Sequence, residues 1–547
     1  MKYAIGIDLG TTHSALSYMS LDSTTARGQS QSVLPVAQLT GPGVVEPRQL
    51  LPSFLYLPAA QEFPVGSLGL PWNPDLGLVV GELARSHGAK VPSRLISSAK
   101  SWLCHPTADR RAPILPWQAP ADVSKMSPVD ASAKYLEHLK QAWNREFAAT
   151  APLEKQDVVV TVPASFDAAA RDLTIEAATK AGITKVTLLE EPQAALYAWL
   201  EAMGDGWRKQ LRAGDVLLVI DLGGGTSDFS LIGVSDASGD LSLERLAVGD
   251  HILLGGDNMD LTLAYALNEK LKAQGKQLDA WQHNALTYAC RAAKESLYQD
   301  ALLEKVAINV PGRGSSLMGQ SIKTELTRDE LSKLLTDGFF PRVESSAVPA
   351  QARRSGLAQV GLPYAQDAAV TKHLASFLSR QAKSLALDGT FARPTAVLFN
   401  GGVLKAAPLR ARLMEVMNSW LAEVKAAPAR ELPGADMDLA VARGAAYYAW
   451  VKAGHGIRIR GGTGRSYFVG VESSMPAIPG FEPVVKALCV APLGMEEGTE
   501  ADVPPQEFGL VVGEPTRFRF FSSSTRRDDK VGDLIDDDLD HAVEQMK

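Results

Sequence analysis

The chain has 547 residues, more than a single hydrophobic core usually organises, so its length predicts at least two domains. A hydrophobic content of 46%, a charged content of 21% and a net charge of -7 are typical of a globular protein, and they offer no electrostatic basis for binding nucleic acid or an anionic membrane. Cys104, Cys290 and Cys489 are far apart and form no Cys-x-x-Cys pair, which argues against a disulfide framework or a zinc site. Because the sequence shows no signal-peptide pattern and no apolar run long enough to cross a bilayer, we expect a cytoplasmic protein.

Short apolar runs alternate with segments of helical spacing along most of the chain. The runs that predict buried strands cover residues 3–8, 157–163, 186–191, 215–221 and 395–402. The segments that predict helices cover residues 168–182, 258–275, 283–300, 328–340 and 439–454. This alternation indicates an α/β fold.

The residue pattern of the sequence changes after Gly454. In residues 455–472 and 508–524, apolar and polar residues alternate with the period of a β-strand, and Gly and Pro interrupt the pattern. This predicts a smaller β-rich unit. The acidic cluster at 528–541 is expected to be a solvated tail, and the Ala-, Pro- and Ser-rich residues 341–370 are expected to be a loop or insertion with weak helicity.

One acidic, Gly- and Thr-rich turn occurs twice, as "IGIDLGTTHS" at 5–14 and "VIDLGGGTSD" at 219–228. Glycines let backbone N–H groups approach a phosphate closely, and Thr hydroxyls add donors. An Asp at the end of each strand would repel phosphate unless Mg²⁺ lay between them. One such turn alone is as well explained by a structural Asp. The pair predicts two turns that hold one polyphosphate from opposite sides, with Asp8 and Asp221 sharing the metal.

Seven stretches occur in an order that resembles a known family. They are "IGIDLGTTHS", "VVVTVPASFDAAARDLTIEAATKAGI", "LLEEPQAAL", "DLGGGTSDFSL", "LGGDNMD", "VLFNGGVLK" and "DMDLAVARGAA". They resemble the ATPase domain of the seventy-kilodalton heat-shock chaperones (DnaK-type), within the actin-like ATPase superfamily, and the resemblance runs from about residue 2 to 453. It implies a two-lobed α/β fold of duplicated half-domains followed by a small β-rich segment. Lobe I would cover 1–215 with an outer subdomain at about 60–140, lobe II would cover 216–454 with an outer subdomain at about 255–330, and the β-rich unit would cover 455–547.

The resemblance also implies a set of catalytic and metal-binding residues. Asp8, Asp221 and Asp228 would organise Mg²⁺ and its waters. Glu191 would position water or metal, and we favour it over Glu190 because it directly precedes Pro192. Lys100 would face the γ-phosphate, where a cation neutralises developing charge; the alternative is a solvated surface lysine.

The resemblance further implies contacts to ATP or ADP. The residues are Gly10, Thr11, Thr12, His13, Gly223, Gly224, Gly225, Thr226, Gly255, Gly256, Arg291, Lys294, Tyr298, Gly401, Gly402, Lys405 and Asp438. Several of them depart from the family pattern, which has Asn at His13, Glu at Arg291 and Arg at Lys405. Tyr298 could stack on a base, and Asp438 has the alternative of a helix N-terminal Asp.

The resemblance weakens downstream and at the signalling positions. Pro163 and Arg171 match interlobe and interdomain signalling positions, although Arg171 also suits a helix surface. The family's acidic, Leu-rich linker is replaced by a basic, Gly-rich stretch at 452–468, and no long helical lid follows the β-rich segment. Either a shortened chain or an incomplete peptide clamp is consistent with this pattern.

These observations predict a divergent heat-shock-type chaperone that binds MgATP between two lobes, hydrolyses it slowly to ADP and couples lobe closure to partner binding. Its expected partners are unfolded polypeptides and co-chaperone or exchange-factor proteins, with no nucleic acid and no membrane. The alternatives are a nucleotide-sensing scaffold with little or no hydrolysis and, less in keeping with the motifs, a small-molecule kinase or a filament former of the same superfamily.

Overall fold

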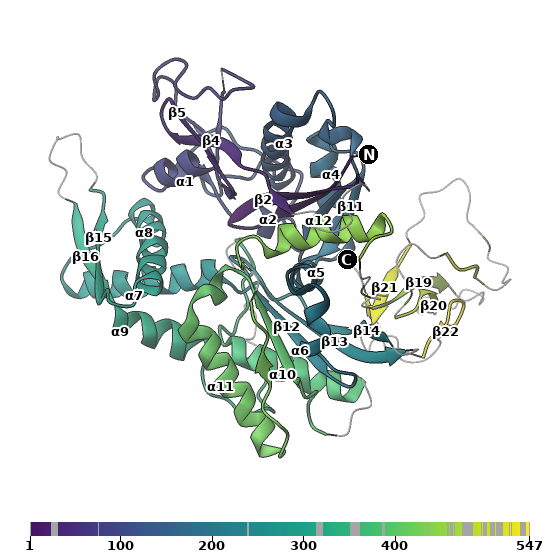
Figure 1. Ribbon diagram of the computed structural model, residues 1–547. Helices are drawn as coiled ribbons and strands as arrows, with labels where there is room; N and C mark the ends of the chain where they lie inside the picture. Colours follow the sequence, from purple (N-terminus) through teal and green to yellow (C-terminus); the bar gives the residue numbers. More distant parts are fainter. Residues whose placement is uncertain are drawn as a thin grey trace, which may run out of the picture.

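The computed structural model describes two large α/β lobes and a smaller β-rich unit (Figure 1). The described residues are 2–22, 31–74, 76–237, 240–312, 321–350, 361–384, 389–434 and 436–456, together with 459, 463, 465–472, 485–493, 495, 500–503, 509, 518–523, 526, 528–535 and 543–545. In Figure 1 the first lobe, purple to blue, lies above the second lobe, teal to green, and the yellow C-terminal strands lie to one side.

The first lobe is built on a six-stranded sheet in the order β11-β10-β1-β2-β3, with β6 paired to β2. Its strands are β1 (Tyr3–Leu9), β2 (His13–Ser20), β3 (Ser32–Val33), β6 (Leu51–Pro52), β10 (Val158–Val162) and β11 (Val186–Glu190). β1 and β2 form an antiparallel hairpin, and β1 pairs in parallel with β10. The helix α4 (Ala168–Lys180), capped by the Asp167 side chain, connects the parallel strands β10 and β11.

The second lobe repeats this arrangement. Its five-stranded sheet has the order β14-β13-β12-β17-β18. The strands are β12 (Val216–Leu222), β13 (Ser227–Ala237), β14 (Asp240–Val248), β17 (Ala396–Asn400) and β18 (Arg430–Glu431). Here β12 forms the hairpin with β13 and pairs in parallel with β17. Each Asp-Leu-Gly turn is therefore the tip of an equivalent hairpin, and the predicted α/β fold with duplicated halves is confirmed.

Two helices join the sheets. The helices α5 (Glu191–Met203) and α12 (Ala440–Lys452) cross between the lobes (Figure 1). They approach so closely that a methyl group on Gly444 would lie 1.7 Å from the Ala194 carbonyl oxygen. On the other side of α12, a methyl group on Gly6 of β1 would lie 2.1 Å from the Ala446 nitrogen. One hydrophobic cluster accordingly contains buried residues of both lobes, including Trp199 and Leu217.

Further elements form the outer parts of the two lobes. In the first lobe they are β4 (Val36–Gly41), β5 (Val44–Arg48), β7 (Leu55–Tyr56), β8 (Val79–Val80), α1 (Glu82–Gly88), β9 (Leu95–Ile96), α2 (Ala99–Trp102) and α3 (Pro128–Phe147). In the second lobe they are α7 (Gly256–Ala273), α8 (Ala280–Gln299), β15 (Lys305–Val310), β16 (Ile322–Thr327), α9 (Arg328–Leu331), α10 (Val370–Ser384) and α11 (Ala407–Glu423); the short α6 (Trp207–Gln210) precedes β12. Residues 341–350 and 361–369 contain neither helix nor strand, in keeping with the expected loop, and 351–360 lie outside the described residues.

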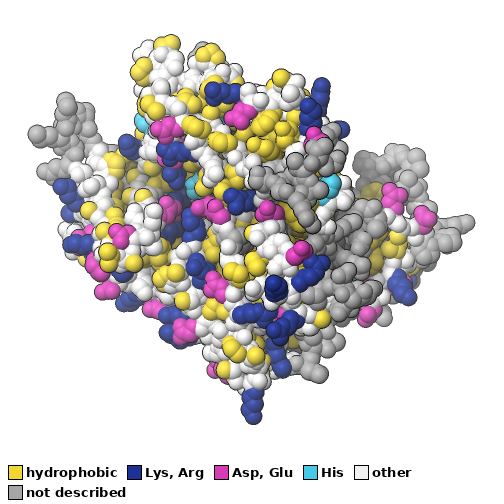
Figure 2. All heavy atoms as spheres, viewed as in Figure 1, with side chains coloured by type: hydrophobic (Ala, Val, Ile, Leu, Met, Phe, Trp, Pro, Cys, Tyr) yellow, Lys and Arg dark blue, Asp and Glu magenta, His cyan; other side chains and the backbone are white. Residues whose placement is uncertain are grey.

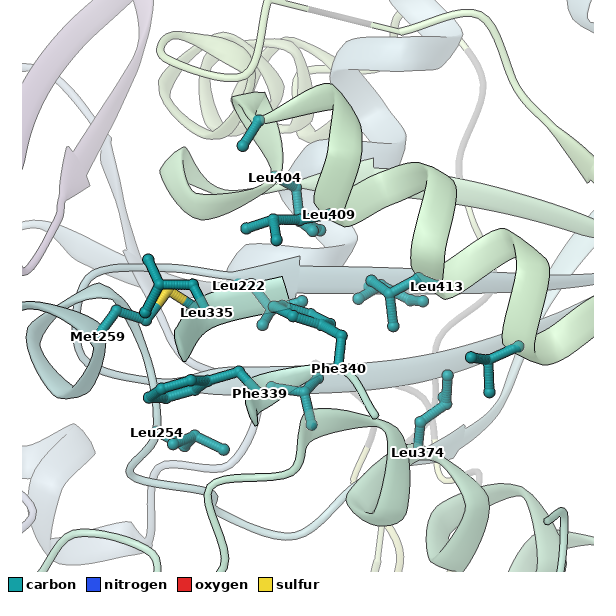
Figure 3. Close-up of a cluster of buried hydrophobic side chains, with 14 of the residues drawn as sticks. Leu222, Leu254, Met259, Leu335, Phe339, Phe340, Leu374, Leu404, Leu409 and Leu413 are labelled. Carbon is teal, nitrogen blue, oxygen red and sulfur yellow. The ribbon is translucent and has the colours of Figure 1, made fainter. Parts of the chain in front are cut away.

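The core of the second lobe supports the Asp221 turn. Figure 3 shows Leu222 and Leu254 beside Phe339, Phe340 and Met259 in one buried cluster. Leu222 lies at the start of the turn, and Leu254 lies just before α7. Burial of these two side chains in the core therefore holds both segments in place. On the surface in Figure 2, acidic and basic side chains lie next to one another over much of the described area.

The C-terminal unit is a five-stranded sheet in the order β22-β20-β19-β21-β23, as the alternating pattern predicted. The strands are β19 (Ser466–Glu472), β20 (Val485–Ala491), β21 (Phe520–Ser523), β22 (Leu534–Ile535) and β23 (Glu544–Gln545). The prediction of a solvated acidic tail is wrong at β22, because Leu534 and Ile535 pair with β20 and Ile535 is buried in the core of this unit. Residues 536–541 of the acidic cluster lie outside the described residues.

No helix among the described residues combines the length and the apolar character needed to cross a membrane.

Candidate active site

The two Asp-Leu-Gly turns face each other across the junction of the lobes. A methyl group on Gly224 would lie 2.1 Å from Thr12 Oγ1, and one on Gly225 would lie 3.2 Å from Thr11 Cγ2 and 2.4 Å from Ser101 Oγ. Glycine is therefore the residue that lets the second turn approach the first this closely. The structure brings together the predicted residues of both turns.

Local hydrogen bonds hold each turn in place. In the first turn, Ser53 Oγ donates to the Gly10 carbonyl oxygen at 2.7 Å, and the Ser53 N–H donates to the Thr12 carbonyl oxygen at 2.9 Å. In the second turn, the Gly223 N–H donates to the Thr226 carbonyl oxygen at 3.0 Å. The first amides of α7, those of Gly256 and Asp257, donate to the carbonyl oxygens of Gly223 and Gly224 at 3.1 and 2.8 Å. The predicted Gly255–Gly256 segment therefore lies directly against the second turn.

A buried charged cluster lies next to the two turns. The Lys100 ammonium group, on α2, donates to Glu191 Oε1 at the start of α5. Lys100 is only 5% exposed, which excludes the alternative of a solvated surface lysine. Asp8 is the last residue but one of β1, and Asp221 and Asp228 lie opposite each other on β12 and β13.

The carboxylates of this cluster resist ionisation. Burial raises the pKa of Asp8 to about 7, with a further contribution from Glu191. Burial, followed by the charges of Glu191 and Asp228, raises the pKa of Asp221 well above its usual value. Burial opposes the charge on Lys100, but Glu191 and Asp8 outweigh it and raise the lysine pKa. Four carboxyl groups thus share one ammonium group in a dry site, where an additional cation would relieve their repulsion.

The residues fit a hard cation and a polyanion. Asp228 Oδ2, Asn400 Oδ1 and Ser101 Oγ are buried and have no hydrogen-bond partner among the described residues. Oxygen atoms of this kind are the ligands that Mg²⁺ prefers, either directly or through water. No three His, Cys, Asp or Glu side chains of the described residues are grouped so that they could hold a metal ion by themselves. A cation here would therefore take further ligands from phosphate and water.

The residues predicted for the adenosine side contact other protein groups in this structure. Arg291, on α8, forms ion pairs with Asp257 and Asp260 of α7, both at 2.6 Å, and Lys294 pairs with Asp260 at 2.7 Å. Tyr298 packs against the hydrophobic core of the second lobe. Arg291 and Lys294 thus belong to one network of ion pairs beside the second turn, whereas the Tyr298 side chain points into the core of the second lobe.

The remaining predicted residues lie directly after β17, just before α12 and, for His13, at the start of β2. Gly401 has a φ of 89°, and a methyl group on it would lie 2.6 Å from Asp221 Oδ1, so glycine leaves that carboxylate its space. A methyl group on Gly402 would meet no atom within 4 Å. Lys405 and Asp438 form an ion pair at 2.7 Å. Burial, followed by the charge of Arg85, lowers the pKa of His13 to about 4, so this imidazole is neutral.

Several residues that touch the cluster were not predicted. Thr161 Oγ1 donates to Asp8 Oδ1 at 3.2 Å, Asn400 Nδ2 donates to Asp221 Oδ2 at 2.8 Å, and Ser165 Oγ donates to Asp228 Oδ1 at 2.6 Å. Asn400 directly precedes the predicted Gly401, so its place in the "FNGG" motif was a usable signal. Thr161 and Ser165 flank Pro163 and gave no signal of their own. Arg171, predicted as a signalling position, pairs with Glu190 at 2.9 Å, and Glu190 pairs in turn with Arg245 of β14 in the second lobe.

Comparison with known proteins decides the family. A family model described as "Hsp70 protein" matches residues 75–352. The chain belongs to the Hsp70 family. The Hsp70 ATPase domain has the two-lobed actin-like fold, so the predicted fold, with its two hairpins on equivalent sheets, is confirmed.

Relatives of this Hsp70-family chain include bacterial chaperones. The "Chaperone protein HscA" of Enterobacter sp. (strain 638) is 32% identical over 349 residues, which cover 61% of this chain and 46% of the relative. The protein of the same name from Salmonella paratyphi C is 32% identical over 344 residues, covering 61% and 47%. That of Photorhabdus laumondii is 33% identical over 282 residues, covering 49% and 38%. The matched part of the chain thus spans about half the length of these relatives or less.

Proposed function

We propose that this chain binds MgATP between the Asp8 and Asp221 turns, hydrolyses it slowly to ADP and couples closure of its lobes to the binding of a polypeptide. The observation that carries the proposal is the meeting of two Gly- and Thr-rich turns from different lobes beside a buried cluster of Lys100, Glu191, Asp8, Asp221 and Asp228. One ligand held by both turns would draw the lobes together, so nucleotide state and lobe closure would be linked.

The chain's own residues account for the steps of this reaction. When bound, Mg²⁺ would neutralise charge on the phosphates, with Asp8 and Asp221 holding it and Asp228 holding its water. Glu191, kept in place by Lys100, would orient the attacking water, and the Lys100 ammonium group would stabilise the charge that develops on the γ-phosphoryl group. In the described arrangement the turns touch, so the lobes must separate before a polyphosphate can enter.

The finer assignments belong to the same proposal. Lobe I would comprise residues 1–215, lobe II 216–454 and a partner-binding β unit 455–547. The adenosine side would be formed by Arg291, Lys294 and the Gly401–Lys405 segment. Clients and co-chaperone or exchange-factor proteins would be the partners, as the name of the HscA relatives suggests. The three cysteines are free, which agrees with the reducing cytoplasm that we propose as the location.

A second candidate is a nucleotide-sensing scaffold that does not hydrolyse ATP. The ion pairs of Arg291 with Asp257 and Asp260 favour it. At the position of Arg291 the family has a carboxylate that contacts the ribose, whereas here the side chain is engaged by two aspartates of the protein. Binding without hydrolysis would support this candidate over the first.

The metal assignment is tested by the substitution Asp221→Asn. This change removes a negative charge from the proposed Mg²⁺ site but keeps its size, so we expect the Mg²⁺ concentration needed for half-maximal ATP hydrolysis to rise by roughly ten-fold or more. Titration of ATPase rate against Mg²⁺ for wild type and variant measures this shift. A variant with an unchanged Mg²⁺ requirement would rule out Asp221 as part of the metal site.

A further inference from the structure

Ser165 of the first lobe lies between two residues of the second lobe. It follows β10 closely, and its hydroxyl donates to Asp228 Oδ1 at 2.6 Å, while its backbone N–H donates to the same oxygen at 3.3 Å. The same hydroxyl lies 2.7 Å from Nδ1 of His251, which follows β14. The three side chains therefore form a chain of hydrogen bonds that crosses from one lobe to the other and back.

The direction of these hydrogen bonds follows from the chemistry of the groups. In the ionised form that acts in the proposed reaction, the Asp228 carboxylate can only accept. The Ser165 O–H then donates to it, and a lone pair of Ser165 Oγ accepts from the Nδ1–H of His251. Burial lowers the pKa of His251, so the ring is neutral and carries its single proton on Nδ1. Nε2 of the ring is buried and has no hydrogen-bond partner among the described residues. Among the described residues, the imidazole of His251 therefore acts as a hydrogen-bond donor to Ser165.

We propose that Ser165 and His251 are positioning residues for Asp228, and that they hold its carboxylate in place only while the lobes are closed. This inference rests on the proposed ATPase function, in which Asp228 acts beside Glu191. Fixing Oδ1 leaves Oδ2, which has no partner, presented to the site. Separation of the lobes withdraws Ser165 and breaks its bonds to both partners. The carboxylate then keeps only its side-chain hydrogen bond with Thr226 of its own lobe, so hydrolysis is switched on by closure.

The surroundings of His251 suit such a movement. One side of this segment borders a cavity of about 1100 Å³ whose lining includes His251, Asp250, Phe229 and Phe377. The neighbouring Asp250 pairs with Arg380 at 2.5 Å, which anchors this segment to the second lobe when Ser165 withdraws with the first lobe. His373 of α10 lines the same cavity but bonds to the Asp367 carbonyl oxygen at 2.9 Å, so it provides a matched control.

The first test measures steady-state ATP hydrolysis by the full chain. Ser165→Ala and His251→Ala should each lower kcat by roughly ten-fold or more and leave KM for MgATP within about two-fold of wild type, because they misplace a group without touching the nucleotide. His251→Asn, whose amide nitrogen can replace Nδ1 as the donor, should recover most of kcat. The double variant should be no worse than Ser165→Ala alone, since both act through one chain, and His373→Ala should match wild type. Equal losses for His251→Asn and His251→Ala would overturn the proposal, because they would indicate a packing role.

The second test does not depend on activity. Amide hydrogen exchange of the segment 163–168 in the nucleotide-free protein reports on the Ser165 N–H bond to Asp228. His251→Ala should accelerate this exchange, whereas His251→Asn and His373→Ala should leave it as in wild type. Exchange that is unchanged in His251→Ala would overturn the positioning role even if ATP is hydrolysed. If His251→Ala accelerates the exchange but the wild-type protein does not hydrolyse ATP, the interlobe contact is supported and the proposed function is contradicted.

Discussion

Lys100 and Glu191 show how a single ion pair can serve chemistry rather than stability. Both side chains are buried, and a pair of this kind contributes little net stability because each charge loses its hydration. In the proposed function, the pair supplies a fixed cation and a fixed carboxylate beside the Asp8 and Asp221 turns. The surplus of carboxyl groups around the pair has the same explanation, since their repulsion favours a bound cation.

Replacing Lys100 by Ala tests this account. We expect kcat for ATP hydrolysis to fall by about 10²-fold or more, while the dissociation constant for MgATP changes by less than about five-fold, because the lysine acts on charge that develops in the transition state. Single-turnover hydrolysis and equilibrium titration measure the two quantities. Lys134→Ala, which removes an exposed lysine paired with Glu137, is the control. Equal losses of binding and hydrolysis would make Lys100 a binding or folding residue.

His138 predicts a pH dependence that is separate from the active site. Burial lowers its pKa from 6.5 to about 4, and its Nε2–H donates to the Ala37 carbonyl oxygen at 2.9 Å. The unfolded chain therefore binds the proton first as the pH falls, and the stability contributed by this neutral side chain is lost progressively from pH 6.5 towards pH 4.

Comparison of wild type with His138→Gln isolates this contribution. Between about pH 7.5 and 5.5, the wild-type free energy of unfolding should fall by about 1 kcal/mol more than that of the variant, whose side chain does not titrate. Chemical unfolding of both proteins at both pH values measures the difference. Identical pH dependences would mean that His138 is not held neutral in the fold.

At the scale of elements, the crossing of α5 and α12 sets the distance between the lobes. Gly444 allows this crossing, because any side chain there would collide with the backbone of Ala194.

Gly444→Ala should lower the free energy of unfolding by roughly 3 kcal/mol, as overpacking of a rigid backbone contact does. Gly434→Ala is the control, since a methyl group there would meet no atom within 4 Å. Thermal or denaturant unfolding tests the prediction, and an equal effect of the two substitutions would contradict it.

The strands and helices that carry the phosphate turns could be predicted from the sequence, because their apolar runs end in Asp, Gly and Thr at equivalent places. The helices α3, α10 and α11 were not predicted, although Ser127 before Pro128 is a recognisable cap of α3. The motifs also predicted which residues of the two turns meet at the lobe junction. Thr161, Ser165 and Asn400 could not be identified by spacing, since they lie at least 150 residues from the Asp residues they touch or, for Ser165, on the opposite lobe. Their roles depend on the parallel pairing of distant strands and on how the lobes meet.

At the scale of the whole molecule, polar contacts link the lobes at three levels. Ser98 Oγ donates to Asp257 Oδ2 at 2.5 Å near the α7 turn, Ser165 joins Asp228 beside the charged cluster, and Glu190 pairs with Arg245 below it. Each contact joins a residue of the first lobe to one of the second. A closed state held by several modest contacts of this kind can be opened and closed by the differential binding of one ligand.

Among the described residues, Arg465 of the C-terminal unit contacts the segment that carries His251. Arg465, directly before β19, lies 3.4 Å from Asp250, the residue next to His251. In the proposed function, a polypeptide bound by the β-rich unit would lie a short distance from the lobe junction.

The central claim, that nucleotide chemistry at the paired turns is linked to polypeptide binding, is tested most directly by single-turnover hydrolysis of MgATP by the purified chain. The rate is measured with and without a permanently unfolded polypeptide, such as reduced and carboxymethylated α-lactalbumin. Our account predicts slow hydrolysis that the polypeptide accelerates. Hydrolysis at the same rate with and without polypeptide would contradict the linkage, and MgATP binding with no hydrolysis would contradict the ATPase assignment itself.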